Sequence, residues 1–204
     1  MEKARIAELL SPFVSGLDDA RLAQLSSYLD LLLRWNARMN LTAVRNPEQM
    51  VTRHFGESLF AATRLVAQDS KGSLIDVGSG AGFPGIPIKI SAPGMAVRLI
   101  ESRLRKAMFL REVVRTLRLE KAEVFLGRAE SCEAKGDVVT LRAVEQFESV
   151  LPVAARLLAP QGRLALLIGA AQVKSAREIL PQMKWQDPVA VPQSSARVLL
   201  VGIN

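Results

Sequence analysis

The hydrophobic positions of the first 70 residues recur at helical spacing. Leucines follow one face of a helix over residues 22–32, and Asp18 stands where that helix needs a cap. The tripeptide Asn46-Pro47-Glu48 supplies the cap, first-turn proline and first-turn acid that open a second helix, which we expect to run through Val66. We therefore predict an N-terminal helical extension over residues 1–70.

From residue 73 onward, short apolar runs alternate with amphipathic segments. We predict strands at 73–77, 96–100, 122–126, 137–141, 163–168, 187–192 and 197–203, and helices near 84–91, 102–118, 145–158 and 172–181. Strands that alternate with helices indicate a mostly parallel sheet covered by helices on both faces. The last two strands have no helix between them, so we expect them to pair antiparallel. Residues 71–204 are thus predicted to form one compact α/β unit with a seven-stranded sheet whose last strand is antiparallel.

A glycine-rich turn follows the first predicted strand. The apolar run 74–77 ends at Gly78, and Gly78, Gly80 and Gly82 then alternate. Glycines let the backbone turn sharply and approach a ligand closely, and the helix that follows aims free N–H groups at the same place. A strand, a glycine loop and a helix form the nucleotide-cofactor arrangement of doubly wound α/β sheets.

The spacing of these glycines distinguishes between cofactors. The dinucleotide pattern G-x-G-x-x-G, counted from Gly78, requires a glycine where Phe83 stands, and the literal match over 80–85 starts past the strand and contains Pro84. An acid two residues before the first glycine, Asp76, instead makes the segment similar to motif I of the S-adenosylmethionine (SAM) methyltransferases. A purely structural glycine turn is the alternative.

Composition limits the remaining functions. The chain has 204 residues, 49% of them hydrophobic, which excludes a disordered protein. No apolar stretch approaches the roughly 20 residues of a membrane span, and the single cysteine, Cys132, cannot form an internal disulfide, so we expect a cytoplasmic protein. His54 is the only histidine, which makes metal or Ser/Cys nucleophilic catalysis a poor hypothesis. We expect a structural or capping contact for His54 and no metal.

The net charge of +7 is concentrated in the middle of the chain. On the predicted helix 102–118, Arg111, Arg115 and Arg118 form a stripe beside an apolar face. Such a stripe is typical of a surface that binds a polyanion such as RNA. A solvated helix face without a ligand is the alternative.

Two charged residues end predicted strands at the edge where a cofactor would bind. Glu101 ends the second strand and can accept hydrogen bonds from two ribose hydroxyls, while Ser102 is expected to cap the following helix. Arg142 ends the fourth strand. We expect it to lie beside cofactor and substrate.

Longer sequence blocks resemble the RsmG (GidB) family over nearly the whole chain. The matching blocks are Trp35-Asn36, residues 40–45, Arg53-His54, residues 75–87, Glu101-Ser102, Lys106, Phe109-Leu110, Arg128-Ala129-Glu130 and Arg142-Ala143. The family is the bacterial 16S rRNA (guanine-527-N7)-methyltransferase, a SAM-dependent enzyme of Rossmann-like fold with an N-terminal helical extension.

The resemblance implies a set of cofactor contacts and a substrate. The implied SAM contacts are Gly78, Phe83, Glu101, Ser102, Ala129, Glu130 and Arg142, to which the glycine-loop argument adds Gly80. The implied partner is 16S rRNA or a small-subunit ribosomal particle, bound by a monomer without a membrane anchor. N7 of guanine carries a free lone pair and no proton, so no general base is expected. No residue is assigned as catalytic, and Arg142 is the best candidate near the reaction centre.

The chain departs from the family pattern at three places. Val144 replaces a common phenylalanine, Ile168-Gly169 lacks a lysine that often follows, and Gly56 replaces a longer residue before Glu57. We expect these departures near the RNA side. Two other functions therefore stay open, namely a SAM methyltransferase for a small molecule or a protein, and a non-catalytic RNA- or ribosome-binding protein with the same fold.

Overall fold

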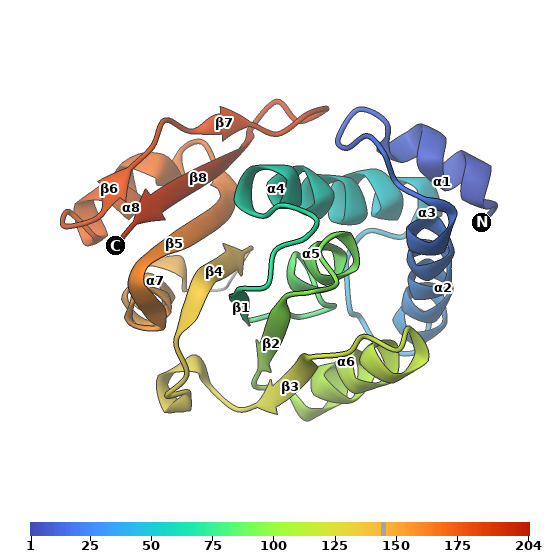
Figure 1. Ribbon diagram of the computed structural model, residues 1–204, viewed down its shortest axis with the longest axis horizontal. Coiled ribbons are helices and arrows are strands. Elements are labelled where there is room, and N and C mark those ends of the chain that lie inside the picture. The colour runs from blue at the N-terminus through green and yellow to red at the C-terminus, as the bar shows by residue number, and fades with distance from the viewer. Residues whose placement is uncertain (144–145) are drawn as a thin grey trace.

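A central sheet lies between two layers of helices in the computed structural model, which describes residues 1–143 and 146–204 (Figure 1). The strands are β1 (Ser73–Val77), β2 (Ala96–Glu101), β3 (Ala122–Leu126), β4 (Gly136–Arg142), β5 (Leu158–Gly169), β6 (Lys184–Trp185), β7 (Val189–Ala190) and β8 (Arg197–Ile203). The helices are α1 (Lys3–Leu10), α2 (Asp19–Asn36), α3 (Pro47–Met50), α4 (Glu57–Leu65), α5 (Gly85–Ser91), α6 (Leu104–Thr116), α7 (Phe147–Arg156) and α8 (Gln172–Ile179). A π-helical turn, η1 (Val51–Gly56), joins α3 to α4, and a short 3-10 turn, η2 (Ala129–Ser131), follows β3.

The sheet is mostly parallel with a reversed last long strand, as predicted. Its order is β3-β2-β1-β4-β5-β8-β6, with β7 also paired to β8. β1 pairs in parallel with both β2 and β4, and β5 pairs antiparallel with β8. The chain leaves β1 toward β2 on one side and returns to β4 on the other, so the carboxyl end of β1 is the switch point where such sheets bind ligands.

One predicted strand was wrong. In the described part of the chain the sheet has eight strands rather than seven, because the strand expected at 187–192 is only the two-residue β7 and a further short strand, β6, precedes that range; both pair antiparallel with β8. Pro188 lies between them and has no N–H to donate to a ladder. The antiparallel pairing expected at this end of the sheet is confirmed.

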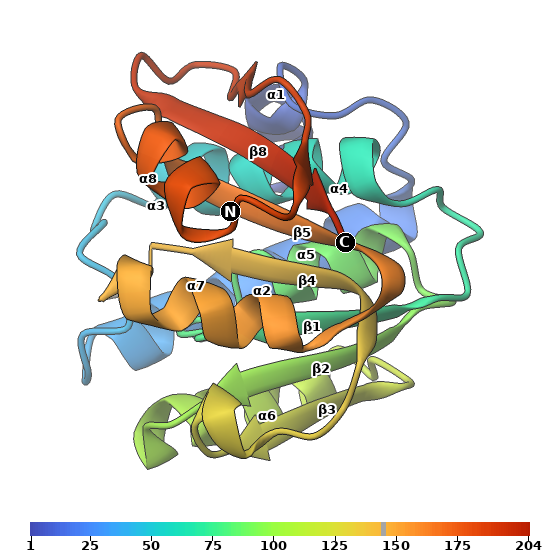
Figure 2. The same cartoon turned by 90° about the vertical axis from the view of Figure 1, so that its left-hand side faces the viewer.

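The two faces of the sheet are covered by different helices. Figure 2 shows α7 and α8 in front of the sheet and α4 and α5 behind it, while α6 lies on the side of α5 in Figure 1.

The start signals of the N-terminal helices are confirmed. The Asp18 side chain accepts a hydrogen bond from the backbone N–H of Arg21 at 2.8 Å, and Asn46 accepts one from that of Gln49 at 3.0 Å. Helical structure beginning at Pro47 ends at Leu65, one residue before the predicted end.

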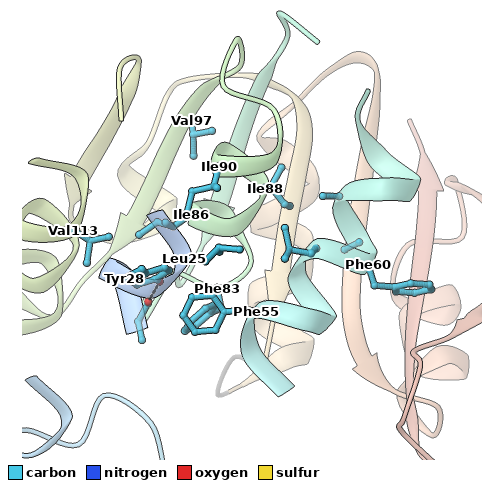
Figure 3. Packing of buried hydrophobic residues seen from close by; sticks show 14 of the residues in the cluster. Leu25, Tyr28, Phe55, Phe60, Phe83, Ile86, Ile88, Ile90, Val97 and Val113 are labelled. Atoms are coloured by element: carbon cyan, nitrogen blue, oxygen red, sulfur yellow. Dashed lines mark hydrogen bonds between the residues drawn. The ribbon is translucent and has the colours of Figure 1, made fainter. Parts of the chain in front are cut away.

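The N-terminal helices and the sheet share one hydrophobic core (Figure 3). Tyr28 of α2 is fully buried and its ring stacks on Phe83, with centroids 5.3 Å apart. Phe55 of η1 meets both rings edge to face, at 5.0 Å from Tyr28 and 5.2 Å from Phe83. A separate domain boundary near residue 70 stays a prediction, and this core crosses it.

Helix α6 is shorter than predicted at both ends. It begins at Leu104 with Arg103 as N-cap, so Ser102 is not the cap that the sequence indicated. It ends at Thr116, and Arg118 follows with a left-handed φ of 49°. Arg118 therefore lies beyond the helix that was expected to carry it.

Candidate active site

The glycine loop, residues 78–82, leaves β1 at the switch point. Gly80 and Gly82 have φ values of 58° and 90°, a region that favours glycine. A Cβ at Gly82 would stand 2.5 Å from both Tyr28 Oη and Ile86 Cδ1, whereas one at Gly80 would meet only the Gly78 carbonyl, at 3.8 Å. Gly82 thus packs the loop against the core, while Gly80 has open space in front of it.

Glu101 holds this loop from the end of β2. Its carboxylate is 5% exposed, and its two oxygens accept hydrogen bonds from the backbone N–H groups of Gly80 at 3.0 Å and Arg103 at 2.8 Å. Each oxygen keeps a second lone pair. Acceptance of ribose hydroxyls by Glu101 stays a prediction, and the carboxylate also ties the loop to the start of α6.

Asp76 supports the loop from below. Its carboxylate is fully buried and accepts hydrogen bonds from Thr140 Oγ1 at 2.7 Å and from the backbone N–H of Gly85 at 3.2 Å. Burial raises the pKa of Asp76 to about 6. The acid of the glycine pattern is therefore a support for the turn into α5.

Two pockets meet at Gly78. The Ala129 pocket, about 140 Å³, is lined by Gly78, Ser102, Ala129 and Glu130 together with Arg128 and apolar residues. The Arg142 pocket, about 220 Å³, is lined by Gly78, Gly80, Phe83 and Arg142, and also by Thr42, His54 and Lys106. Seven of the predicted cofactor residues thus line one or both pockets, and the eighth, Glu101, is bonded to Gly80 beneath them. Their individual roles stay predictions.

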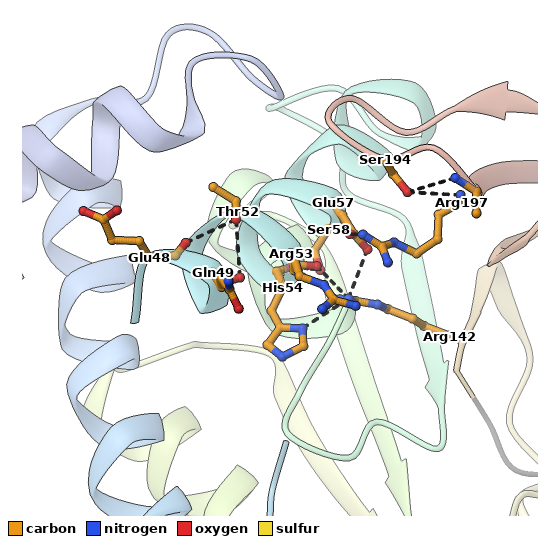
Figure 4. Close-up of polar contacts among 11 residues, drawn as sticks. Glu48, Gln49, Thr52, Arg53, His54, Glu57, Ser58, Arg142, Ser194 and Arg197 are labelled. Carbon is orange, nitrogen blue, oxygen red and sulfur yellow. Dashed lines mark hydrogen bonds and ion pairs between the residues drawn. The ribbon is translucent and has the colours of Figure 1, made fainter. Parts of the chain in front are cut away.

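Arg142 is anchored by a buried polar network (Figure 4). Its Nη2 donates to the backbone carbonyl of Arg53 at 2.6 Å and to Glu57 Oε2 at 3.1 Å, and it lies 3.2 Å from His54 Nδ1. Glu57 is 1% exposed, and its other oxygen pairs with Arg197 Nη2 at 2.5 Å. One buried carboxylate therefore serves two guanidinium groups, one of which lines the pocket beside the glycine loop.

His54 lies in the Arg142 pocket, where sequence reasoning had not placed it. Its ring stacks on Phe83 with centroids 5.0 Å apart, and its Nε2 lies 2.7 Å from Thr42 Oγ1. Burial, with the nearby charges of Arg142 and Arg53, lowers the pKa of His54 to about 3, so the ring is neutral. The available signal was the Arg53-His54 block of the family resemblance, which no local pattern explained.

The predicted arginine stripe is on the surface, outside both pockets. Arg111, Arg115 and Arg118 are exposed. Beside the stripe, a groove of about 770 Å³ separates the end of α2 from α6, and we call it the α2–α6 groove. Its lining residues are Arg34, Trp35, Ala37, Arg38, Met39, Arg105, Met108 and Glu112. In the described chain, no acidic side chain forms an ion pair with the stripe or with the groove's three arginines.

Two departures from the family pattern lie in the interior. A Cβ on Gly56 would stand 2.7 Å from the ring of Phe13, so this glycine makes room for the N-terminal segment, and Ile168 is 4% exposed. Burial does not test whether these positions lie near the RNA side, and that expectation stays a prediction for Gly56 and Ile168. Val144 lies outside the described residues.

Within residues 1–143 and 146–204, no three His, Cys, Asp or Glu side chains gather closely enough to hold a metal ion. No described helix has both the length and the apolar character that crossing a membrane requires.

Solved structures share this fold. TYW2 of P. horikoshii, crystallised with MeSAdo, superposes with a TM-score of 0.61 at 13% identity, covering 74% of this chain and 62% of that chain. A mostly parallel sheet with a reversed strand and a glycine loop at its switch point defines a Rossmann-like methyltransferase fold.

Sequence comparison gives the family. Residues 21–196 match the GidB family, rRNA small subunit methyltransferase G. The enzyme of that name from Stenotrophomonas maltophilia is 42% identical over 193 residues, covering 93% of this chain and 89% of its own. That of Xylella fastidiosa is 44% identical over 156 residues, covering 76% and 72%. The chain belongs to the rRNA small subunit methyltransferase G family.

Proposed function

We propose that this protein binds SAM across the two pockets that meet at Gly78 and transfers its methyl group to N7 of guanine 527 of 16S rRNA. The observation that carries the proposal is the meeting of eight predicted cofactor residues at one edge of the sheet. The residues fit SAM, because Gly80 leaves its face of the loop open and each oxygen of Glu101 keeps a second lone pair for a ribose hydroxyl. Cytoplasmic location and a monomeric state are parts of the same proposal.

The site suits a transfer that needs no base. The lone pair of guanine N7 forms the new N–C bond while the S–C bond of SAM breaks and its electron pair stays on sulfur, so no proton is removed. The two carboxylates nearest the loop, Asp76 and Glu101, are buried and hydrogen-bonded, and both nitrogens of His54 have partners. The residues therefore act by alignment, which supplies much of the rate of a two-reactant step.

The proposal is tested by incubating the protein with methyl-labelled SAM and either naked 16S rRNA or small-subunit particles, then mapping the modified base. We expect one 7-methylguanosine, at position 527. Label on a small molecule or a protein instead would support the first alternative function. SAM that fails to bind in calorimetry would support the non-catalytic one.

We further propose that the arginine stripe binds RNA phosphates. Changing Arg111, Arg115 and Arg118 to glutamine removes three cations, and each phosphate contact contributes roughly 0.7 to 0.9 to the log–log slope of affinity against salt. We expect the slope to flatten by about two to three units with unchanged SAM affinity.

The matched control changes Lys174, Arg177 and Lys184, exposed cations of the α8 side, to glutamine, which alters net charge equally. In this control variant, the slope of log RNA affinity against log salt should stay close to that of the wild type. Equal slopes in the stripe variant and the wild type would move the RNA surface to the Arg34 and Arg38 side of the α2–α6 groove.

A further inference from the structure

Thr42 lies at the rim of the Arg142 pocket and is anchored by a backbone hydrogen bond. It lies in the loop after α2, where the buried Asn36 side chain accepts a hydrogen bond from its backbone N–H at 2.9 Å. The Thr42 side chain is half-buried and lines the pocket together with Gly80 and Arg142. Its hydroxyl therefore stands where a substrate would meet the glycine loop.

The hydrogen bonds fix which nitrogen of His54 carries the proton. Arg142 Nη2 has no lone pair to accept a hydrogen and lies 3.2 Å from His54 Nδ1, so we assign to Nδ1 the tautomer that turns a lone pair, rather than an N–H, toward the guanidinium. The remaining nitrogen of the ring, Nε2, then carries the hydrogen and donates it to Thr42 Oγ1 at 2.7 Å. Glu57 sets this direction, because it holds the Arg142 guanidinium in place.

The hydrogen bonds that the Thr42 oxygen accepts leave its hydroxyl free only to donate. Its oxygen accepts from His54 Nε2 and from the backbone N–H of Val44 at 3.1 Å, which uses both lone pairs of a hydroxyl. Among the described residues, none accepts the hydroxyl hydrogen. The pocket therefore contains one oriented O–H donor that awaits an acceptor from outside the protein.

We infer that Thr42 donates this hydrogen bond to O6 of the target guanine and so determines the choice of base. The inference rests on the proposed function, which brings guanine N7 to this pocket. Guanine presents N7 and O6 side by side as two acceptors, whereas adenine presents N7 beside an amino group that donates. Thr42 cannot accept from that amino group, because both lone pairs of its oxygen are occupied. The arrangement accepts guanine and rejects adenine at the same position.

A carboxylate is the other acceptor that could reach this hydroxyl. The methionine part of SAM carries one, and the glycine loop lines the same pocket. The two sources differ in what the loss of the hydroxyl changes. Loss of a bond to O6 alters base discrimination, and loss of a bond to the carboxylate weakens SAM binding.

The test pairs a protein change with a base change. Wild type, Thr42→Val and Thr42→Ser are compared on an rRNA fragment that carries guanine or 2-aminopurine at the target, since 2-aminopurine keeps N7 and lacks O6. A hydrogen bond of ordinary net strength is worth about tenfold. We expect wild type and Thr42→Ser to prefer guanine by about tenfold in kcat/KM. Thr42→Val should have a kcat/KM about tenfold below that of the wild type on guanine RNA and an unchanged kcat/KM on 2-aminopurine RNA, so it should show no preference.

Thr63→Val is the matched control, because Thr63 is exposed on α4 and bonded to the Phe60 carbonyl at 2.8 Å. If Thr42→Val does not fold, Thr42→Ala removes the same hydroxyl and carries the test. A guanine preference that survives loss of the hydroxyl overturns the inference, and so does a weakened SAM affinity with the preference intact, which assigns the hydroxyl to the cofactor. A wild type that methylates neither RNA contradicts the proposed function itself.

Discussion

Gly80→Val abolishes SAM binding while the protein still folds. Nothing in the structure but the Gly78 carbonyl, at 3.8 Å, meets a Cβ at this position, so the new side chain fills the space in front of the loop. The φ of 58° adds strain of about 1–3 kcal/mol, which a domain of this size tolerates. We expect the Kd for SAM in calorimetry to rise beyond measurement, with melting lowered by several degrees.

Gly82→Val is the matched variant. Its Cβ would collide with Tyr28 Oη and Ile86 Cδ1, both at 2.5 Å, so the fold itself should fail. Normal SAM affinity in folded Gly80→Val would show that the cofactor does not approach this loop.

Arg142→Ala lowers methyl transfer by about 100-fold and also lowers stability. The first effect follows from its place beside Gly80 and Phe83, since a misalignment of two reactants by about 1 Å lowers the rate by about 100-fold. The second follows from the loss of its bonds to Glu57 and to two backbone carbonyls. Because Arg197 still pairs with Glu57, we expect a loss of about 2–4 kcal/mol, less than for an orphaned buried charge. Single-turnover rates and thermal melting measure the two effects.

Arg197→Ala distinguishes the effect on methyl transfer from the effect on stability. It removes the other partner of Glu57 but lies outside the described lining of the Arg142 pocket, so it should destabilise similarly and keep SAM affinity and rate. An equal loss of rate in both variants would make Arg142 a structural partner of Glu57 and nothing more.

The sequence predicted the parts of the site that depend on local order. The glycine spacing after β1 and the ends of β2 and β4 are set by neighbours in the chain, and parallel strands bring their carboxyl ends to one edge. Local patterns could also place Asp18 and Asn46 as caps, since a cap contacts an N–H three residues away.

Contacts between distant segments could not be predicted in this way. The sequence gives no local sign of the carboxylate partner of Arg142, because that partner, Glu57, lies 85 residues earlier in the chain. Tyr28 shares a helix with the regular leucines and gives no local sign that it meets Phe83. Ser102 looks like a cap, but Glu101 takes the N–H of Arg103.

The Tyr28 hydroxyl donates to the carbonyl of Ala81 in the glycine loop, and its ring stacks on Phe83. The glycine loop is therefore shaped from two directions, by Glu101 of the sheet and by helix α2. The conformation of this loop consequently depends on contacts from outside residues 71–204. Without α2, residues 71–204 would keep every residue that lines the Ala129 pocket. The glycine loop would lose its hydrogen bond from Tyr28, and the ring of Phe83 would be exposed to water.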